Sequence, residues 1–438
     1  MSDARKAALA VCRTLTEAGH RALFAGGCVR DELLGKHPHD YDVATSATPD
    51  EVEGLFGRVV TVGKAFGVQI VHSGEHDVEV ATFRWDGPYL DGRRPASVEF
   101  RDEQQDALRR DFTVNALFFD PIADEVLDYV GGREDLARAC IRAVGDPVDR
   151  FNEDHLRLLR CVRFAAQLDF QIERATFDAL KSHAYLIKKT SPERIRDELF
   201  RILTQSHAAR GFHLLDESGL LPHLLPEISA MKGVEQPPEY HPEGDVFVHT
   251  MKMLQLLDSP SPTLALGVLL HDVGKPQTQT FEDRIRFNGH EKVGAEMAAD
   301  VCARLRLSNA DSERVVWLVG QHMRVSAVKE MRESKLKRLI REEGFDELLE
   351  LFRVDCESSH RRMETYEWLR DRAAALGPEE VRPEPLLTGD DLIGLGMKPG
   401  PEFARILRTI EDLQLEGRIQ TRDEALDLVN RGDLEPGP

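Results

Sequence analysis

Two aspartates separated by one residue, Asp40 and Asp42, lie near the start of the chain. Side chains two positions apart on a strand point to the same face, so we expect these two carboxylates to lie together on a strand. Paired carboxylates repel each other unless a hard cation lies between them, and Mg²⁺ holding triphosphate oxygens is the natural occupant. We therefore interpret Asp40 and Asp42 as Mg²⁺ ligands. Glu79 is either a third carboxylate of this site or a solvent-facing strand residue.

A glycine pair, Gly26 and Gly27, follows the apolar run 22–25 and predicts a turn at the end of a strand. Without a Cβ, glycine lets backbone N–H groups come close to a phosphate. Arg30, one helical turn further on, can add a charged fork to the same anion. The glycine turn and the aspartates together favour nucleotide and metal chemistry, although either alone would be an ordinary surface feature.

A third polar group lies in one short segment and comprises Arg109, Arg110, Asp111 and Asn115. Asp111 and Asn115 are one helical turn apart and can share a face. A guanidinium beside a carboxylate and an amide can recognise a triphosphate and a ribose hydroxyl. The alternative interpretation is a helix cap with a salt bridge.

Residues 152–166 have the apolar periodicity of one strong helix, and Arg157, Arg160 and Arg163 recur along one flank. Asp154 and Arg157 are three positions apart and are therefore neighbours on the helix surface. This pair is either an ordinary intrahelical ion pair or a device for reading bases.

The base-reading interpretation follows from the Watson–Crick edges. Cytosine and adenine present an amino donor beside a ring-nitrogen acceptor, whereas uracil and guanine present a carbonyl beside an N–H. A carboxylate that accepts from the amino group and an arginine that donates to the ring nitrogen would admit cytosine and adenine. Each mismatched polar group of uracil or guanine would cost roughly 1–3 kcal/mol. We therefore predict that Asp154 and Arg157 select CTP and ATP without a nucleic-acid template.

The second half of the chain contains His249, the pair His271-Asp272, His290 and His322, with Asp355 further on. Isolated histidines are usually structural, but histidines and carboxylates brought together from several helices can form a divalent metal site with open positions. The apolar run 264–270 predicts a helix that carries His271-Asp272 into a turn.

The elements that must position the first groups are the strands and helices of a small sheet domain. β-rich runs at 59–62, 68–72 and 78–83 are separated by glycine-containing turns. Thr48 and Glu51 have the spacing of a capping box and predict a capped helix over 49–56. Residues 85–105 are polar and rich in glycine and proline, so we expect a mobile loop beside the site.

The length, cysteine content and net charge of the chain limit its possible domain number, cellular compartment and partners. The 438 residues are too many for one core and predict two to four domains. Six scattered cysteines without a Cys-x-x-Cys motif favour reduced thiols and a cytoplasmic protein. The net charge of −20 argues against a protein that coats nucleic acid nonspecifically, but it permits a local basic binding site. No apolar run is long enough to span a membrane, and the oligomeric state cannot be predicted.

With these motifs in order over residues 20–205, the chain resembles the class II tRNA nucleotidyltransferases, the CCA-adding enzymes, which share a superfamily with bacterial poly(A) polymerases. The motifs that carry the resemblance are Gly26-Gly27-Cys-Val-Arg30-Asp31, Asp40-Tyr-Asp42, Arg109-Arg-Asp-Phe-Thr-Val-Asn115, Asp128-Tyr-Val-Gly-Gly132, Glu153-Asp-His-Leu-Arg157 and Ser191-Pro-Glu-Arg194. Over residues 240–360, the histidine pattern resembles the HD phosphohydrolases.

The resemblance implies an α+β protein: a small mixed-sheet nucleotidyltransferase head followed by all-helical neck, HD and tail domains. We place these four domains at residues 1–144, 145–232, 233–375 and 376–438. In the head, Asp40 and Asp42 would bind Mg²⁺ and act in catalysis with Arg110. The implied nucleotide-binding residues are Gly27, Arg30, Arg110, Asp111, Asn115, Asp154, Arg157, Arg160 and Arg163.

In the HD domain, the resemblance implies His249, His271 and Asp272 as ligands of a divalent transition metal or Mg²⁺. Asp355 and His290 are further candidates, because divergent HD domains differ in these later positions. It also implies CTP, ATP and tRNA as partners, and template-independent addition of CCA to tRNA 3′ ends. The loop after Arg84 resembles the flexible loop of enzymes that add all three nucleotides. Related HD domains remove 2′,3′-cyclic phosphate or 2′-phosphate, so we expect such a repair activity.

Three alternatives remain open. The same head could belong to a poly(A) polymerase or to an enzyme that adds only A, because the catalytic motifs are nearly shared. The chain could be an HD phosphohydrolase with a degenerate head, or a catalytically silent RNA-binding protein. The presence of Asp40, Asp42, Asp154 and Arg157 argues against both of the latter.

Overall fold

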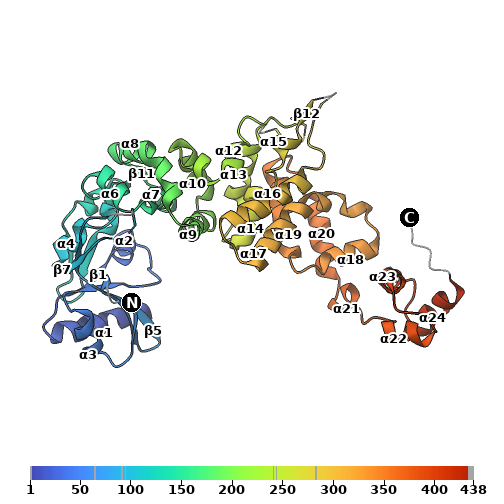
Figure 1. Ribbon diagram of the computed structural model, residues 1–438, viewed down its shortest axis with the longest axis horizontal. Helices are drawn as coiled ribbons and strands as arrows, with labels where there is room; N and C mark the ends of the chain where they lie inside the picture. The colour runs from blue at the N-terminus through green and yellow to red at the C-terminus, as the bar shows by residue number, and fades with distance from the viewer. Residues whose placement is uncertain are drawn as a thin grey trace. The chain divides into compact units, whose positions relative to one another are not determined.

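The computed structural model describes residues 2–63, 66–89, 92–93, 95–239, 241–242, 244–281 and 284–432. The chain forms two compact units, Met1–Ser229 with Arg304–Arg306, and Ala230–Ala303 with Leu307–Pro438 (Figure 1). The finer division into head, neck, HD and tail domains at residues 144, 232 and 375 stays a prediction.

The first unit is built on a seven-stranded sheet in the order β3-β4-β5-β2-β1-β8-β9. Its strands are β1 (Ala22–Ala25), β2 (Val43–Thr45), β3 (Val59–Gly63), β4 (Val68–Ser73), β5 (His76–Thr82), β8 (Leu117–Asp120) and β9 (Glu125–Asp128). In this sheet β2 and β5 are parallel, and the other neighbouring pairs are antiparallel. The mixed sheet and the helices that follow it confirm the predicted α+β class.

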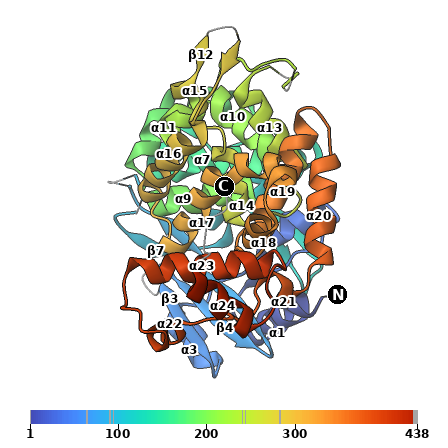
Figure 2. The same ribbon diagram turned by 90° about the vertical axis from the view of Figure 1, so that its right-hand side faces the viewer.

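β1 lies between β2 and β8, and all four of its side chains are buried. Phe24 of this strand packs edge-on against Tyr41, with ring centroids 5.2 Å apart. α1 (Asp3–Glu17) packs against β1, β4 and β5. Figure 2 shows α1 beside β4. Because β1 is held on both edges and covered by a helix, the glycines that follow it start from a fixed position.

The two aspartates precede a strand rather than forming part of one. β2 begins at Val43, so Asp40 and Asp42 lie in the connection after α2 (Gly27–Leu33), and the predicted strand position was wrong. The carbonyl oxygen of Asp42 accepts a hydrogen bond from the Ala25 backbone N–H at 3.0 Å. This bond keeps Asp42 beside the glycine turn although it lies outside the strand.

Residues 84–108 are more regular than the predicted mobile loop. β6 (Arg84–Asp86) pairs antiparallel with β7 (Val98–Phe100), and α4 (Glu103–Leu108) follows. The loop prediction is therefore wrong at both ends of this segment. Its central positions Leu90, Asp91 and Arg94 lie outside the described residues. The capping box at Thr48 and Glu51 is confirmed and begins α3 (Pro49–Leu55).

The helix predicted over residues 152–166 is two helices, α6 (Pro147–Glu153) and α7 (Leu156–Leu168). Between them Asp154 is extended, with φ −138° and ψ 107°. Its Oδ1 accepts the backbone N–H of Leu156 at 3.1 Å. A short polar side chain that bonds a nearby backbone N–H competes with helix continuation, which explains the break.

The rest of the first unit is mainly helical. Its remaining elements are η2 (Thr113–Asn115), α5 (Gly132–Ala137), β10 (Cys140–Ile141), β11 (Gln171–Ile172), α8 (Arg174–His183), η3 (Ala184–Lys189), α9 (Pro192–Leu203), α10 (Ala208–Glu217), α11 (Leu221–Leu224) and α12 (Pro226–Ser229). α9 begins after Ser191 and ends at Leu203, as predicted. It packs against α7, which places its first turn near Asp154.

The second unit is almost entirely helical. Its elements are α13 (Val246–Leu256), α14 (Pro262–Leu270), α15 (Lys275–Thr278), β12 (Thr280–Phe281), β13 (Ile285–Arg286), α16 (His290–Arg304), α17 (Asn309–Gln321), η4 (His322–Glu330), α18 (Glu333–Ile340), α19 (Phe345–Ser358), α20 (Glu364–Ala375), α21 (Pro378–Val381), α22 (Gly389–Gly394), α23 (Pro401–Leu415) and α24 (Arg422–Arg431). The apolar helix α14 confirms the prediction for residues 264–270. Within the described ranges, no helix is both long and apolar enough to cross a membrane.

Candidate active site and metal centre

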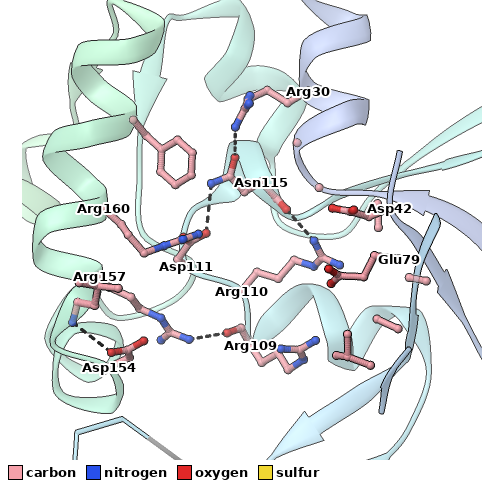
Figure 3. A pocket seen from close by; sticks show the side chains of 18 of the residues that line it. Arg30, Asp42, Glu79, Arg109, Arg110, Asp111, Asn115, Asp154, Arg157 and Arg160 are labelled. Atoms are coloured by element: carbon pink, nitrogen blue, oxygen red, sulfur yellow. Dashed lines mark hydrogen bonds and ion pairs between the residues drawn. The ribbon is translucent and has the colours of Figure 1, made fainter. Parts of the chain in front are cut away.

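A pocket of about 570 Å³ opens in the first unit between the sheet and α7. Eight arginines and four acidic residues line it, so the pocket is basic although the whole chain carries a net charge of −20. Figure 3 shows Asp42 and Glu79 at one side of the pocket and Asp154 with Arg157 at the other. This distribution suits a ligand with a strongly anionic part and a separate polar edge.

The acidic side of the pocket is formed by Asp42 and Glu79. Glu79 lies on β5, one residue before the Val80 that pairs with Val43 of β2. Desolvation and the charges of Glu79 and Asp40 raise the pKa of Asp42 to about 6, although Arg110 opposes the shift. Asp40, Asp42 and Glu79 are all exposed, but only Asp42 and Glu79 line the pocket. The structure therefore places Asp42 and Glu79 at the pocket and leaves Asp40 outside its lining.

The glycine turn lies next to the arginine that was predicted to take part in catalysis. Gly26 has φ +75°, and a Cβ there would lie 2.9 Å from Nη1 of Arg110. The same Nη1 donates to the carbonyl oxygen of Asn115 at 3.1 Å. Only glycine allows the backbone and this guanidinium to approach so closely. Gly27, the next residue, also lines the pocket.

A chain of hydrogen bonds connects Arg30 to α7. Arg30 Nη1 donates to Oδ1 of Asn115 at 2.6 Å, and Asn115 Nδ2 donates to Oδ1 of Asp111 at 3.2 Å. Arg160 completes the chain with bonds from Nε and Nη2 to Oδ2 of Asp111, at 2.8 Å and 2.6 Å (Figure 3). The predicted meeting of Asp111 and Asn115 is thus confirmed. Burial opposes ionisation, but Arg160 and Arg157 lower the pKa of Asp111 to about 2.

Two buried acids that anchor the arginines were not predicted. Asp106 on α4 accepts hydrogen bonds from both Arg109 and Arg110. Glu198 on α9 accepts from Nε of Arg163 at 2.5 Å. Asp106 could have been found, because it precedes the two arginines by three and four helical positions. Glu198 could not, because its partner lies on another helix.

Asp154 and Arg157 both line the pocket, but each has other partners. Both carboxylate oxygens of Asp154 accept from Arg194 of α9, at 3.0 Å and 2.7 Å. Arg157 donates from Nη2 to the carbonyl oxygen of Arg109 at 2.9 Å and from Nη1 to Glu153. The alternative of a simple Asp154–Arg157 ion pair therefore finds no support among the hydrogen bonds of these side chains. Arg194 was quoted in a motif, but no role was predicted for it.

The second unit brings together the histidines and acids of its predicted metal centre. His249 Nε2 lies 3.2 Å from Oδ1 of Asp355, and His271 Nε2 lies 3.1 Å from Oδ2 of Asp272. His290 and His322 join the same buried cluster. Despite burial, His271 and Lys275 hold the pKa of Asp272 well below its usual range.

This cluster has the donors of a metal centre. His271 Nδ1 lies 2.8 Å from the carbonyl oxygen of Val268, which makes Nδ1 the protonated nitrogen and leaves a lone pair on Nε2. One donor atom from each of His249, His271 and Asp272 lies within 4.8 Å of the other two, and all three side chains are buried. Imidazole nitrogens and a carboxylate oxygen that converge in this way are suitable ligands for a divalent cation. His322 was part of the predicted pattern but was not predicted as a ligand.

The fold and the sites define a class of protein with a nucleotidyltransferase-type head, a helical region and a helical domain that contains a buried cluster of histidines and aspartates. Three family models agree with it: "Poly A polymerase head domain" matches residues 22–142, "Probable RNA and SrmB-binding site of polymerase A" matches 169–232, and "HD domain" matches 246–350.

Curated relatives identify the family more narrowly. A CCA-adding enzyme of Streptococcus pyogenes is 32% identical over 440 residues, covering 98% of this chain and 97% of the relative. One of Lactobacillus helveticus is 44% identical over 214 residues, which span 49% of this chain and 53% of the relative. The chain therefore belongs to the CCA-adding enzyme family, which confirms the resemblance predicted from the motifs.

Solved structures agree with this assignment. The Bacillus stearothermophilus CCA-adding enzyme in complex with CTP has a TM-score of 0.74 at 27% identity, with 99% of this chain and 98% of that chain covered. The Thermotoga maritima CCA-adding enzyme complexed with tRNA has a TM-score of 0.60 at 19% identity, with 99% of each chain covered. The second likeness shows a shared fold.

Proposed function

We propose that this protein adds CCA to tRNA 3′ ends from CTP and ATP without a nucleic-acid template. The observation that carries the proposal is the arginine-lined pocket, which has carboxylates at one side and the Asp154–Arg157 corner at the other. The arginines suit the negative charge of a triphosphate, and Asp154 with Arg157 suits the polar edge of a base. Likeness to the CTP complex and to full-length curated CCA-adding enzymes supports the same assignment.

The chemistry of the acidic side fits Mg²⁺, with Asp42 and Asp40 as ligands and Glu79 beside them. A bound Mg²⁺ would neutralise phosphate charge and lower the pKa of the primer 3′-hydroxyl. The chain's own residues hold and orient the nucleotide: Gly27 allows close approach of a phosphate, and Arg110 presents a guanidinium fixed by Asp106 and Asn115. These groups would align the α-phosphate with the primer hydroxyl.

Base choice would depend on Asp154 and Arg157. Asp154 already accepts two hydrogen bonds from Arg194, but a carboxylate has further lone pairs that can accept from an amino group of cytosine or adenine. Asp154→Ala should therefore raise UTP incorporation relative to CTP, or abolish addition, while Mg²⁺ binding persists. Unchanged discrimination against UTP would refute this role.

The central experiment offers labelled CTP and ATP to three tRNAs: one ending before CCA, one after the first C, and one after CC. A CCA-adding enzyme extends all three to the same end. Incorporation of ATP alone on the shortest tRNA, with CTP supplied, would contradict the proposal and favour the A-adding or poly(A) alternative. Free cysteines at all six positions support a reducing cytoplasm as the place of this activity.

A second activity is favoured by the metal centre of the second unit. We infer that His249, His271 and Asp272, with Asp355 nearby, bind a divalent metal and that this centre hydrolyses 2′,3′-cyclic phosphate or 2′-phosphate groups. Arg284 and Arg286 line the same cavity of about 580 Å³, which suits an anionic ester. Purified protein should cleave a 2′,3′-cyclic nucleotide only when loaded with metal, and His271→Ala should not. Absence of this activity in the metal-loaded protein would contradict the inference.

A further inference from the structure

Phe164 of α7 lines the arginine-lined pocket of the first unit, and three arginines of that pocket lie around its ring. The Cζ atom of Arg163 lies 3.9 Å from the ring centroid, that of Arg160 lies 5.2 Å away and that of Arg30 lies 5.5 Å away. A guanidinium within about 6 Å of a ring centroid is attracted by the negative face of the ring, more strongly where water is excluded. Because Phe164 is 6% exposed, its ring lies where water weakens these attractions least.

Elements far apart in the sequence supply the groups around the Phe164 ring. Arg160 precedes Phe164 by four positions and is its neighbour on the helix surface. Arg30 comes from α2, which begins directly after the turn at Gly26. The ring of Phe112 packs edge-on against that of Phe164, with centroids 5.9 Å apart and planes at 73°. Phe164 is thus held by Phe112 while arginines from two helices lie around it.

Two of the three arginines keep an unused N–H group. Arg30 and Arg163 each donate from Nε and Nη1 to one carboxylate and one amide. These acceptors are Asp31 and Asn115 for Arg30, and Glu198 and Gln167 for Arg163. Nη2 of each arginine donates to no residue that the structure describes. A guanidinium donates within its plane, so the ring can lie against its face while the edge stays open for a phosphate.

The ring also lowers the cost of gathering positive charge in the pocket. Burial lowers the pKa of Arg163, and the charge of Arg160 adds to this shift, although Glu198 opposes it. A further carboxylate would relieve the repulsion, but it would also neutralise the charge and occupy the N–H groups that a phosphate needs. An aromatic ring attracts the cations and carries no net charge, so it leaves their charge for an anionic ligand.

We propose that Phe164 is a positioning residue for nucleotide addition, whose ring holds Arg30, Arg160 and Arg163 with their remaining N–H groups available to the triphosphate. The inference rests on the nucleotide-binding function proposed above. Phe164 acts through the arginines, and it takes no part in the chemistry. The contribution of the ring should therefore depend on the phosphates of the ligand: it should strengthen the binding of CTP and leave the binding of cytidine nearly unchanged.

The test changes the charge of the ring face at nearly constant size. Phe164 is replaced in the full-length chain by phenylalanines that carry one, two or three ring fluorines, which withdraw electrons from the face. Calorimetry gives the Kd of CTP with Mg²⁺ and without tRNA, and ligand-observed nuclear magnetic resonance gives the Kd of cytidine. We expect the Kd of CTP to rise with each fluorine and to reach about tenfold, or about 1.4 kcal/mol, with three. The Kd of cytidine should change by less than about twofold.

Phe177 of α8 supplies the matched control. Nζ of Lys181 lies 5.5 Å from the centroid of its ring, and Phe177 is not among the residues that line the pocket. The same fluorines at Phe177 should leave the Kd of CTP unchanged. Circular dichroism establishes that each protein is folded, and if three fluorines at Phe164 prevent folding, the trend over one and two fluorines decides.

The outcomes separate the role of Phe164 from the function on which it rests. A Kd of CTP that stays constant across the Phe164 series would overturn the positioning role while leaving nucleotide binding intact. An equal rise for CTP and cytidine would also overturn it, because the ring would then contact the base or the sugar. A parent protein that binds no CTP would contradict the proposed function itself, and the positioning role with it.

Discussion

The buried ion pair between Asp111 and Arg160 connects the head to α7, and Asp111→Asn tests how much it stabilises the first unit. The Asp111 side chain is 8% exposed and that of Arg160 is 30% exposed, with a closest approach of 2.6 Å. Asparagine keeps the shape of the side chain but removes the charge. The variant therefore leaves Arg160 in place without its buried counter-ion.

The magnitude follows from the pKa of Asp111, which falls from 3.8 to about 2. One pKa unit corresponds to about 1.4 kcal/mol. After a reduction for solvent screening at the partly exposed Arg160, the ionised carboxylate stabilises the first unit by about 2 kcal/mol. Because the folded-state pKa is lowered, this stabilisation is fully present above pH 3.8 and is lost as the pH falls through about 2. At pH 3 about half of it should remain.

The assay follows urea unfolding by the fluorescence of Trp85, the tryptophan of the first unit, in a background with Trp317→Phe and Trp368→Phe. In this background the fluorescence reports unfolding of the first unit alone, because Trp85 is the one tryptophan that remains. Asp111→Asn should lower the free energy of unfolding by about 2 kcal/mol at pH 7 and by about 1 kcal/mol at pH 3.

The matched control is Asp178→Asn, which removes an exposed ion pair from the same unit. Asp178 is 64% exposed, its partner Arg174 is 93% exposed, and they lie 3.6 Å apart. We expect its loss to change the free energy of unfolding by less than about 0.5 kcal/mol. Equal destabilisation of the two variants, or an effect of Asp111→Asn that is the same at pH 7 and pH 3, would contradict this role of the buried ion pair.

Three further substitutions test the pocket. Arg194→Met removes the two hydrogen bonds that Arg194 donates to the Asp154 carboxylate. The ratio of kcat/KM for CTP over UTP should then fall about tenfold or more, from a loss of roughly 1–3 kcal/mol; an unchanged ratio would mean that Arg194 does not position Asp154. Gly92→Ala places a Cβ 2.2 Å from Nε2 of His155 and should slow CTP and ATP addition alike, whereas Gly74→Ala, at a similar positive φ with nothing within 4 Å, should not. Asp106→Asn should raise KM for CTP more than it lowers kcat, because Arg109 and Arg110 lose their shared anchor; steady-state kinetics would show the opposite split if these arginines act mainly in the transition state.

Much of the fold is predictable because its signals are local. The apolar run before Gly26 predicts the buried β1, and the cap at Thr48 predicts α3. The meeting of Asp111 and Asn115 also follows from spacing along the chain. The anchors Glu198 and Arg194 do not, because they lie 35 and 40 residues from the side chains that they bind. Such contacts depend on how α9 packs on α7, which no periodicity within either helix specifies.

The positions of the histidine side chains in the second unit were also only partly predictable from the sequence. His271, His290 and His322 lie at helix ends, and each Nδ1 contacts the carbonyl oxygen three residues before it. The apolar run 264–270 predicts the helix end at His271, but no helix boundary was predicted at His290 or His322, and the direction of each ring depends on this local bond. Because all three rings use it, all three present Nε2 toward the Asp272 carboxylate, at 3.1 Å, 3.3 Å and 3.9 Å. A pattern of histidines therefore indicates a metal site, while the direction of each ring depends on the fold.

The break at Asp154 changes how base choice must be understood. On one continuous helix, Asp154 and Arg157 would be neighbours and could form an ion pair with each other. In the structure the chain turns between α6 and α7, Arg194 holds Asp154, and the carbonyl oxygen of Arg109 holds Arg157. Each side chain is thus fixed separately, with hydrogen-bonding capacity left for a base. Selectivity for cytosine and adenine would then depend on α9 and the head as much as on Asp154 and Arg157, the two residues that we propose contact the base.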